Sequence, residues 1–560
     1  MKKKLFTINL LSAFQKGVQS SVVLFVFLLI STASNAQQFT RADTLRGSIT
    51  PERAWWNVLH YSLKVKVNPS DKTISGSNTI LYEVLKPNNI MQIDLQSPMK
   101  IDKVVQKGKE ISFTSEGNAH FLKLRKKQKP GSENEITIYF SGKPREAVRP
   151  PWDGGFTWNK DSNGNHFIAT SNQGIGSSVW WPLKDHPTEE ADNGVTIAVT
   201  TPKNLMNVSN GRLKKTIANK DSTTWIWEVK NPINSYGVNI NIADYVHFGE
   251  IYNGEKGTLD MDYYVLRENI VKAKEHFKQA PMMMEAFEHW FGPYPFYEDG
   301  FKLVEVPYLG MEHQSSVTYG NKYENGYLGS DVSGSGWGMK FDFIIIHESG
   351  HEWFANNITN KDVADMWIHE GFTSYSENIY LDYHFGKKAS SEYVIGVRNN
   401  VVNSTPIVGR NYNVNKPGSS DMYYKGANVL HTVRQLINND EKWRQILRGL
   451  NKDFYHQTVT TQQIENYISE KSGIDLTAFW NQYLRTVKIP TVEYAIDGNK
   501  LKFRYVNIVE NFAMPIIAKI NDNEQWITPS AKWQTKTLSE DIKSFQIKKD
   551  FYVKSSKVKK

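Results

Sequence analysis

The sequence predicts a multidomain α+β protein with an N-terminal antiparallel β domain, a mostly helical middle domain and a small C-terminal β domain. Before about residue 250, apolar residues alternate with polar ones, as at Tyr61, Leu63, Val65 and Val67, and this period of two is typical of half-buried strands. From about residue 267 the apolar spacing becomes helical, and short strand patterns return after Pro490. A length of 560 residues suits about three domains.

Residues 1–36 have the pattern of a secretory signal peptide. A basic start at Lys2, Lys3, Lys4 and Lys16 precedes the apolar run Val22–Ile30, and the small residues Ser34-Asn35-Ala36 precede Gln37. The apolar run is shorter than the roughly 20 residues of a spanning helix. We therefore expect export to the periplasm or the extracellular space, with no membrane span after signal removal. A membrane anchor is the alternative interpretation.

Residues 37–250 form the predicted N-terminal β domain. Two further alternating segments lie at Val195–Val199 and Trp225–Val229, and turn clusters such as Asn68-Pro69-Ser70-Asp71 separate the strands. Because each strand has one apolar and one polar face, an antiparallel sheet with one face on the core is expected.

Residues 251–489 form the predicted helical domain. Glu268–Trp290 has helical spacing interrupted at Pro281, and Lys302–Val306 is a short strand. Later helices are predicted at the apolar-periodic segments Gly426–Asn438, Ile464–Lys471 and Leu476–Leu484. In residues 490–560, the strands Thr491–Ile496 and Leu501–Val506 are joined through Asp497-Gly498, a hairpin-type turn.

Composition excludes several classes of function. The chain contains no cysteine, so disulfides, thiolate metal ligands and cysteine nucleophiles are excluded. The formal charge is +9, and no basic stripe with interleaved stacking aromatics is present, so we expect no nucleic-acid partner. The basic stretches Arg125–Lys129 and Lys554–Lys560 are most simply a solvated hairpin tip and a frayed tail.

The segment His347-Glu348-Ser349-Gly350-His351 carries the strongest chemical signal. On a helix, residues four apart share a face, so both imidazoles can bind one zinc ion while Glu348 serves as general base. A catalytic zinc site usually has three protein ligands, and Glu370 is the third candidate. Glu370 lies at the start of a second predicted helix, with Asp365 as its N-cap. Two histidines that merely cover a surface are the alternative.

Several segments together resemble the zinc aminopeptidases of the aminopeptidase N type, peptidase family M1 (gluzincins). The matching motifs are His347–Phe354, Trp367–Phe372, Leu309-Gly310-Met311-Glu312-His313, Phe291–Phe296 and Trp180–Pro187. The resemblance covers most of the chain after the signal segment. It implies a thermolysin-like catalytic domain, one zinc ion held by His347, His351 and Glu370, and peptide substrates with a free N-terminus.

The resemblance also implies roles for residues outside the metal motif. The family's catalytic tyrosine stands in a Tyr-x-Lys-Gly sequence, which selects Tyr423 and leaves Tyr424 to packing. Glu312, with Gly310 and Met311 in the same substrate-binding loop, is expected to hold the substrate's ammonium group, helped by Gln173. Leu309 and His313 depart from the family pattern, so the preferred first residue is not predicted, and neither is the oligomeric state. His369 is expected to be structural.

Two alternatives remain open. Because only residues 490–560 follow the helical domain, the cleft is expected to be more open than in relatives with a large helical C-terminal domain. The protein is then either an aminopeptidase or a metallopeptidase that also cleaves internally. A secreted, catalytically inactive binding protein on the same scaffold is the other alternative.

Overall fold

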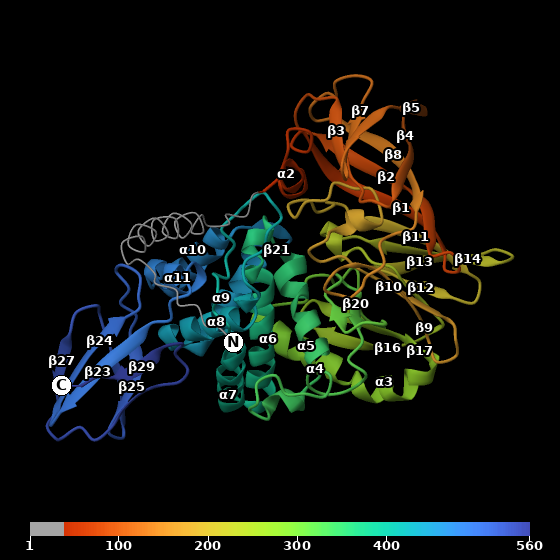
Figure 1. Cartoon of the computed structure of the whole chain (residues 1–560). Helices are drawn as coiled ribbons and strands as arrows, with labels where there is room; N and C mark the ends of the chain where they lie inside the picture. Colours follow the sequence, from red (N-terminus) through yellow and green to blue (C-terminus); the bar gives the residue numbers. More distant parts are fainter. Residues whose placement is uncertain (1–38, 560) are drawn as a thin grey trace, which may run out of the picture.

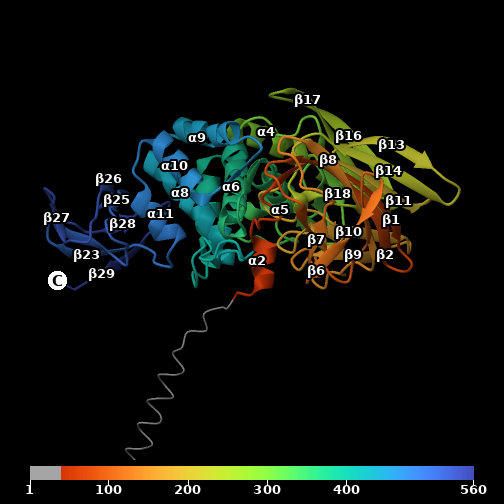
Figure 2. The same cartoon turned by 90° about the horizontal axis from the view of Figure 1, so that it is seen from above.

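A computed structural model describes residues 39–559, which form three regions arranged in space in the same order as in the sequence (Figures 1 and 2). The N-terminal strands, orange to yellow, and the C-terminal strands, blue, lie at opposite ends of the molecule, with helices between them. The predicted signal peptide, residues 1–36, lies outside the described residues. Within residues 39–559, no helix combines the length and the hydropathy needed to cross a membrane.

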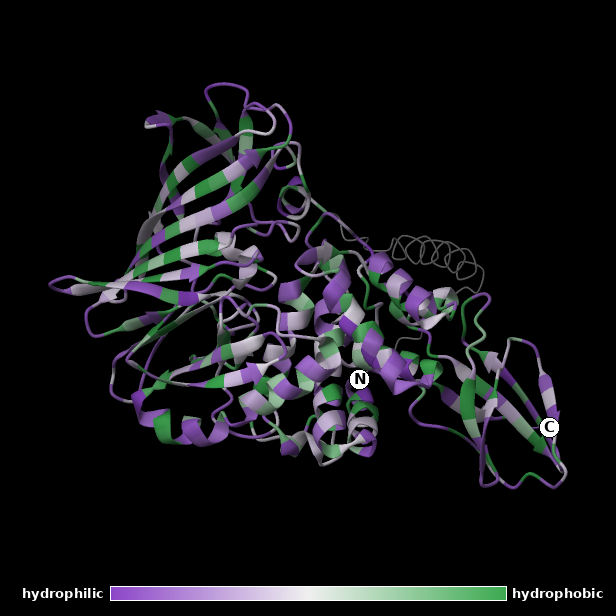
Figure 3. Cartoon of the chain, turned by 180° about the vertical axis from the view of Figure 1, so that it is seen from behind, coloured by the Kyte–Doolittle hydropathy of each residue, from purple (hydrophilic) through white to green (hydrophobic). Residues whose placement is uncertain are grey.

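An eight-stranded sheet forms the frame of the N-terminal region. Its strand β1 (Trp56–Asn68) buries Tyr61, Leu63, Val65 and Val67, as the alternation predicts, and Figure 3 shows hydrophobic and hydrophilic residues alternating along these strands. The strand order is β13 (Arg212–Ala218), β14 (Ser222–Val229), β11 (Val195–Pro202), β1, β2 (Thr73–Val84), β8 (Glu133–Gly142), β4 (Lys100–Gln106) and β5 (Lys109–Ile111).

The strand directions differ from the prediction at one place. Neighbouring strands of this sheet are antiparallel except β1 and β11, which run parallel with Tyr61 opposite Val195. The chain reaches β11 only after a long connection from β1, and a long connection permits a parallel neighbour where a hairpin does not.

Two smaller sheets complete the N-terminal region. One has the order β3 (Ile90–Asp94), β7 (Ala119–Lys123) and β6 (Phe113–Glu116); the other has the order β12 (Met206–Val208), β15 (Asn241–Ala243), β10 (His166–Ser171) and β9 (Gly155–Lys160). Because β10 ends at Ser171, the loop that carries Gln173 starts at the C-terminal end of an interior strand of this sheet. The basic stretch Arg125–Lys129 connects β7 to β8, which belong to different sheets, and is therefore not a hairpin tip.

A five-stranded sheet opens the middle region and places the Glu312 loop. Its order is β16 (Tyr245–Gly254), β17 (Gly257–Leu266), β18 (Phe301–Glu305), β20 (Val317–Tyr319) and β19 (Gly310–Met311). Strand β18 confirms the predicted strand to within one residue. Strand β19 lies at the edge of the sheet, immediately before Glu312. The domain boundary proposed at residue 250 falls within β16.

The predicted helices are present, with differences at their ends. The segment Glu268–Trp290 breaks at Phe277-Lys278 rather than at Pro281, which sits in the first turn of its helix, where an N–H has no helical partner to lose. The helices are α2 (Arg41–Gly47), α3 (Ile270–His276), α4 (Gln279–Phe291), α5 (Phe343–Gly350), α6 (Trp367–Phe385), α7 (Lys387–Val397), α8 (Tyr424–Ile437), α9 (Asp440–Asp453), α10 (Thr461–Ser472) and α11 (Thr477–Leu484). Helices α8, α10 and α11 confirm the three later predictions.

The C-terminal region consists of two small sheets. The first has the order β27 (Gln534–Thr537), β24 (Lys500–Val506), β23 (Thr491–Asp497) and β29 (Lys554–Lys557); the second has the order β26 (Asn523–Ile527), β25 (Ile516–Ile520) and β28 (Phe545–Ile547). The predicted hairpin joins β23 to β24, with Asp497 opposite Lys500. Residues Lys554–Lys557 were predicted to fray, but they pair with β23 because a neighbouring strand satisfies their backbone groups.

Two large apolar cores hold these regions together. One fills the N-terminal sheets around Trp56, Trp180 and Trp181. The other is continuous from β17 to Tyr552 and therefore includes both the helices and the C-terminal sheets. The C-terminal region is thus packed onto the helical region rather than attached by a linker alone.

Candidate active site

Helices α5 and α6 bring the three predicted metal ligands together. Asp342 starts α5 by accepting hydrogen bonds from the N–H groups of Ile344 and Ile345. One helical turn then separates His347 from His351, and both buried rings face Glu370 on α6. The distances to Glu370 Oε2 are 3.8 Å from His347 Nε2 and 3.4 Å from His351 Nε2.

This donor set fits a zinc ion. Ligand atoms about 2.1 Å from a tetrahedral zinc lie roughly 3.4 Å apart, close to the distances observed. Burial alone would lower the pKa of His351, but nearby Glu370 and Glu312 raise it, and Glu370 and Glu377 likewise raise the pKa of His347. Despite burial, the two histidines hold the pKa of Glu370 well below its usual value. An environment that favours positive charge in this way also favours a divalent cation.

The far side of each imidazole is fixed by a hydrogen bond. His347 Nδ1 lies 2.9 Å from Glu377 Oε1, and the hydroxyl of Tyr393 donates to Glu377 Oε2 at 2.6 Å. His351 Nδ1 lies 3.1 Å from the carbonyl oxygen of Phe354. These contacts leave both Nε2 atoms turned toward Glu370. Sequence reasoning missed Glu377, although its position seven residues after Glu370, two turns along the same helix face, was a usable signal.

The predicted base and the predicted amine anchor face the same cavity of about 400 Å³. Burial raises the pKa of Glu348 to about 7, and burial also raises the pKa of Glu312. A carboxylate oxygen from each and one ring nitrogen of His351 all lie within 4.8 Å of one another. Gln173 Nε2 donates to Glu312 Oε1 at 2.7 Å and to Glu370 Oε1 at 2.8 Å. The N-terminal region therefore supplies one wall of the site.

Gly310 and Met311 also line this cavity. A Cβ on Gly310 would lie only 2.6 Å from Ile344 Cγ2 and 3.1 Å from Glu348 Oε1, so the backbone of β19 passes directly over the predicted base. Leu309 lines the cavity as well. His313 does not; its ring is buried and contacts Thr318 Oγ1.

Both neighbouring tyrosines line the cavity, and Tyr423 also lies against a predicted zinc ligand. The ring of Tyr423 stacks on His347, with centroids 6.0 Å apart and an interplanar angle of 16°. Burial raises the pKa of Tyr423 well above its usual value, and Glu370 and Glu312 act in the same direction, so the phenol keeps its proton. Tyr424, predicted to be packing, also lines the cavity, because it begins α8 at the cavity wall.

Two predictions about the second helix have different outcomes. His369 Nε2 accepts a hydrogen bond from the backbone N–H of Asn360, away from the metal ligands, as a structural residue should. The prediction that Asp365 caps the helix is wrong. Asp365 lies in a short turn capped by Asp362, and its carboxylate accepts hydrogen bonds from Tyr412 and Thr461 instead.

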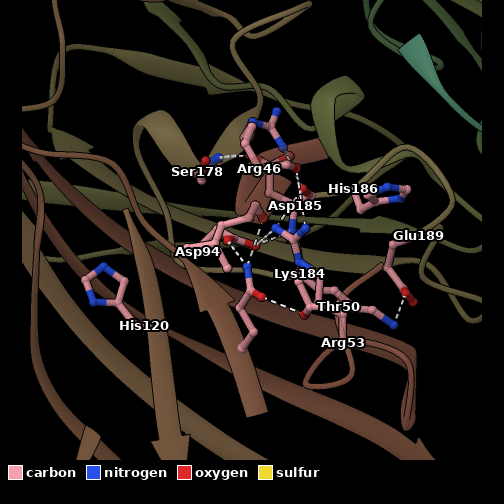
Figure 4. A network of polar contacts seen from close by, with 12 residues as sticks. Arg46, Thr50, Arg53, Asp94, His120, Ser178, Lys184, Asp185, His186 and Glu189 are labelled. Atoms are coloured by element: carbon pink, nitrogen blue, oxygen red, sulfur yellow. Dashed lines mark hydrogen bonds and ion pairs between the residues drawn. The ribbon is translucent and has the colours of Figure 1, made fainter. Parts of the chain in front are cut away.

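A buried polar network fixes the loop that carries Gln173. Arg46 on α2 donates to the carbonyl oxygens of Asp185 and Ile175 and pairs with the Asp185 carboxylate at 3.4 Å. Asp185 Oδ2 in turn accepts from the N–H of Ser178. Figure 4 shows these side chains together with Arg53 and Asp94, which extend the network into the N-terminal core. Sequence reasoning missed this network because its members are far apart in the chain.

Comparison with known proteins identifies the family. The Peptidase M1 N-terminal domain model matches residues 57–236, and the Peptidase family M1 domain model matches residues 275–483. The chain belongs to peptidase family M1. Both matched ranges contain residues of the site just described, since Gln173 falls in the first and the three predicted zinc ligands fall in the second.

Individual M1 relatives are distant in sequence but cover most of this chain. The leucyl aminopeptidase of Saccharolobus solfataricus is 21% identical over 470 residues, covering 80% of this chain and 57% of the relative. The leukotriene A-4 hydrolase of Xenopus laevis is 23% identical over 481 residues, covering 80% of this chain and 74% of the relative. This M1 chain thus spans little more than half the length of the archaeal enzyme.

Solved structures show the same M1 fold. An M1 zinc metallopeptidase from Deinococcus radiodurans, solved with a Tyr-Ser-Ala substrate, superposes with a TM-score of 0.66 at 18% identity, covering 80% of this chain and 98% of the other. Family membership and the donor set of two imidazoles and one carboxylate agree on the cofactor, which is zinc.

Proposed function

We propose that the protein is a zinc-dependent aminopeptidase that releases N-terminal residues from peptides. The observation that carries this proposal is the position of Glu312, a buried carboxylate in the same cavity as the zinc ligands and within 4.8 Å of the predicted base. A carboxylate there can pair with a substrate ammonium only one residue away from the bond being cleaved. Release of the first residue follows from that spacing.

Four residues of the chain have distinct roles in the proposed reaction. When bound, the zinc ion supplies a Lewis acid that acidifies a water molecule and polarises the scissile carbonyl. Glu348 accepts the proton of the attacking water and passes it to the leaving amine. The protonated phenol of Tyr423 donates a hydrogen bond to the developing oxyanion. Glu312 pairs with the ammonium group, and Gln173, which already donates to Glu312, offers its amide oxygen to the same group.

Substitution of the base tests the chemical step. Glu348→Ala should retain zinc and lose about 1,000-fold in kcat, since general acid–base groups contribute about 10²–10⁴-fold. The measurement is turnover of unblocked aminoacyl chromogenic substrates, with and without chelator, alongside zinc analysis. Glu524→Ala, at an exposed carboxylate in β26, is the control. Near-normal turnover by Glu348→Ala would show that the base is misassigned, and a protein without zinc or turnover would favour the inactive binding protein.

The amine anchor is tested by changing either the protein or the substrate. Glu312→Ala should lower kcat/KM for free-amine substrates by about 100-fold, because a buried charge pair to the substrate is lost. N-acetylated peptides should be refused by the parent enzyme. Internal cleavage of acetylated peptides, measured by mass spectrometry of the products, would instead favour the open-cleft metallopeptidase.

We propose, further, that the protein is exported to the periplasm or the extracellular space. Support for export comes from the basic, apolar and small-residue pattern of residues 1–36. Mass spectrometry of the protein recovered from cell fractions and medium should find a mature chain that begins at Gln37. An intact N-terminus in the cytoplasm would contradict export.

A further inference from the structure

A second cavity of about 710 Å³ adjoins the active-site cavity. Leu309 and Trp152 line both cavities and therefore form the wall between them. The rest of the second cavity is lined both by tyrosines and by charged residues, namely Tyr308, Tyr319, Tyr323, Lys272, Glu305, Lys322 and Glu324. Neither the metal ligands nor the groups assigned to the amine reach into it.

Trp152 is held in an exposed position by an ordered loop. Asp153 accepts hydrogen bonds at 2.8 Å from the N–H groups of Val148 and Arg149, and it pairs with Arg145 at 3.1 Å. Despite this support, the side chain of Trp152 is 68% exposed. An exposed indole in a cavity wall can bury a large apolar area when a ligand binds. Because the loop is already fixed, less conformational entropy is lost on binding.

The order of residues along β19 gives the direction in which a substrate lies. Glu312 marks the position of the substrate amine, and Gly310 lies against Glu348, which marks the scissile bond. Strand β19 is at the edge of its sheet, so its free side can pair with an extended peptide. A peptide that starts at Glu312 runs antiparallel to β19 and advances about 3.3 Å per residue. The residue after the scissile bond then reaches Leu309 and Trp152.

We propose that the second cavity binds the part of the peptide downstream of the scissile bond, and that Trp152 and Leu309 contact the side chain of the peptide's second residue. The preferred substrates are therefore peptides of three or more residues with a large apolar or aromatic second residue. This inference rests on the proposed aminopeptidase function, because it takes Glu312 as the position of the first amine. It adds the contribution of the N-terminal region to the choice of substrate.

Binding to a protein with the base removed tests the proposal without requiring turnover. Zinc-loaded Glu348→Gln protein is titrated calorimetrically with Ala-Phe-Ala and with Ala-Ala-Ala. We expect Ala-Phe-Ala to bind about tenfold more tightly, a factor typical of one added aromatic contact. Adding Trp152→Ala should reduce the ratio of the two dissociation constants to below about twofold, whereas Trp152→Phe should retain most of it.

A second exposed tryptophan, far from the cavity in sequence, provides the matched control. Trp533→Ala changes an indole that is 44% exposed in the C-terminal region and should leave the ratio unchanged. Equal affinities in the parent, or a ratio that survives Trp152→Ala, would overturn the proposal. Wild-type protein that releases no first residue from either peptide would refute the aminopeptidase function separately, since the ratio of affinities is measured without catalysis.

Discussion

Glu377 contacts the predicted zinc ligand His347. It is buried, accepts from His347 Nδ1, and is itself held by the hydroxyl of Tyr393. A carboxylate in this position orients the imidazole and makes its other nitrogen a stronger ligand. The orientation of the His347 ring therefore depends on a residue that is not itself one of the predicted zinc ligands.

Glu377→Gln should weaken zinc binding by about 10–100-fold, because the amide keeps the hydrogen bond but loses the negative charge. Competition with a fluorescent chelator measures the zinc dissociation constant. Tyr393→Phe should cause a smaller loss in the same direction. Glu392→Gln, on the exposed face of α7, is the control, and unchanged zinc affinity in Glu377→Gln would contradict the orienting role.

At the residue scale, the sequence was most informative where chemistry follows from local spacing. His347 and His351 are one turn apart, so their common direction is predictable once the segment is helical. The structure also places Glu312, Gln173 and Tyr423 in one cavity with the predicted zinc ligands, although their roles were predicted from resemblance to a family rather than from local spacing. Trp152 and Tyr424 could not be assigned to the cavity from sequence, because only the folded chain shows which aromatic residues line a wall.

Helix α2 is an element whose sequence gives no sign of its role. It is seven residues long, yet Arg46 at its end binds the loop that carries Gln173. The Asp185 carboxylate that pairs with Arg46 is nearly inaccessible, and a buried carboxylate is unstable without its partner. Through Arg46, helix α2 thus helps to hold the loop that forms one wall of the active site.

Arg46→Ala should raise KM for free-amine substrates several-fold and leave kcat and zinc content nearly unchanged, because Gln173 binds the amine equally before and during reaction. Steady-state kinetics provides both constants, and Arg46→Lys should restore part of the loss. Arg41→Ala removes an exposed arginine from the same helix, where it pairs with Glu116, and should have no effect. Identical KM values for Arg46→Ala and Arg41→Ala would contradict the positioning role.

Element boundaries were less predictable than element types. Pro281 was taken as a break, but the first turn of α4 tolerates it. Asp365 looked like a cap, yet tertiary partners bind its carboxylate, and a capped turn from Asp362 precedes the helix. In both cases a local preference allowed two positions, and packing selected one of them.

At the scale of the whole molecule, a partly buried carboxyl joins the N-terminal region to the helical region. The hydroxyl of Thr359 on β21 (Ile358–Asn360) donates to Glu190 Oε1 at 2.5 Å. Burial raises the pKa of Glu190 from an ordinary value of 4.5 to about 7. The folded protein therefore binds this proton more tightly than the unfolded chain, so the contact is most stable when Glu190 is protonated.

The sign of this shift predicts how stability changes with pH. The contribution of Glu190 is fully present below about pH 4.5 and is lost as pH rises through about 7. Glu190→Gln should therefore unfold at a higher urea concentration than wild type at pH 8, with the difference vanishing at low pH. Glu133→Gln, at an exposed position on β8, should show no such change. Equal urea midpoints at pH 8 would contradict the assignment.

Tyr552 has a consequence for how the protein is made. Its carbonyl oxygen accepts a hydrogen bond from Tyr483 on α11, and its N–H donates to Thr432 on α8, the helix that follows Tyr423. A ribosome delivers residue 552 long after residue 423, so the nascent helix lacks this cover until residue 552 has been made. Helix α8, which begins beside Tyr423, is therefore packed on this side only after the C-terminal strands that precede Tyr552 have been made.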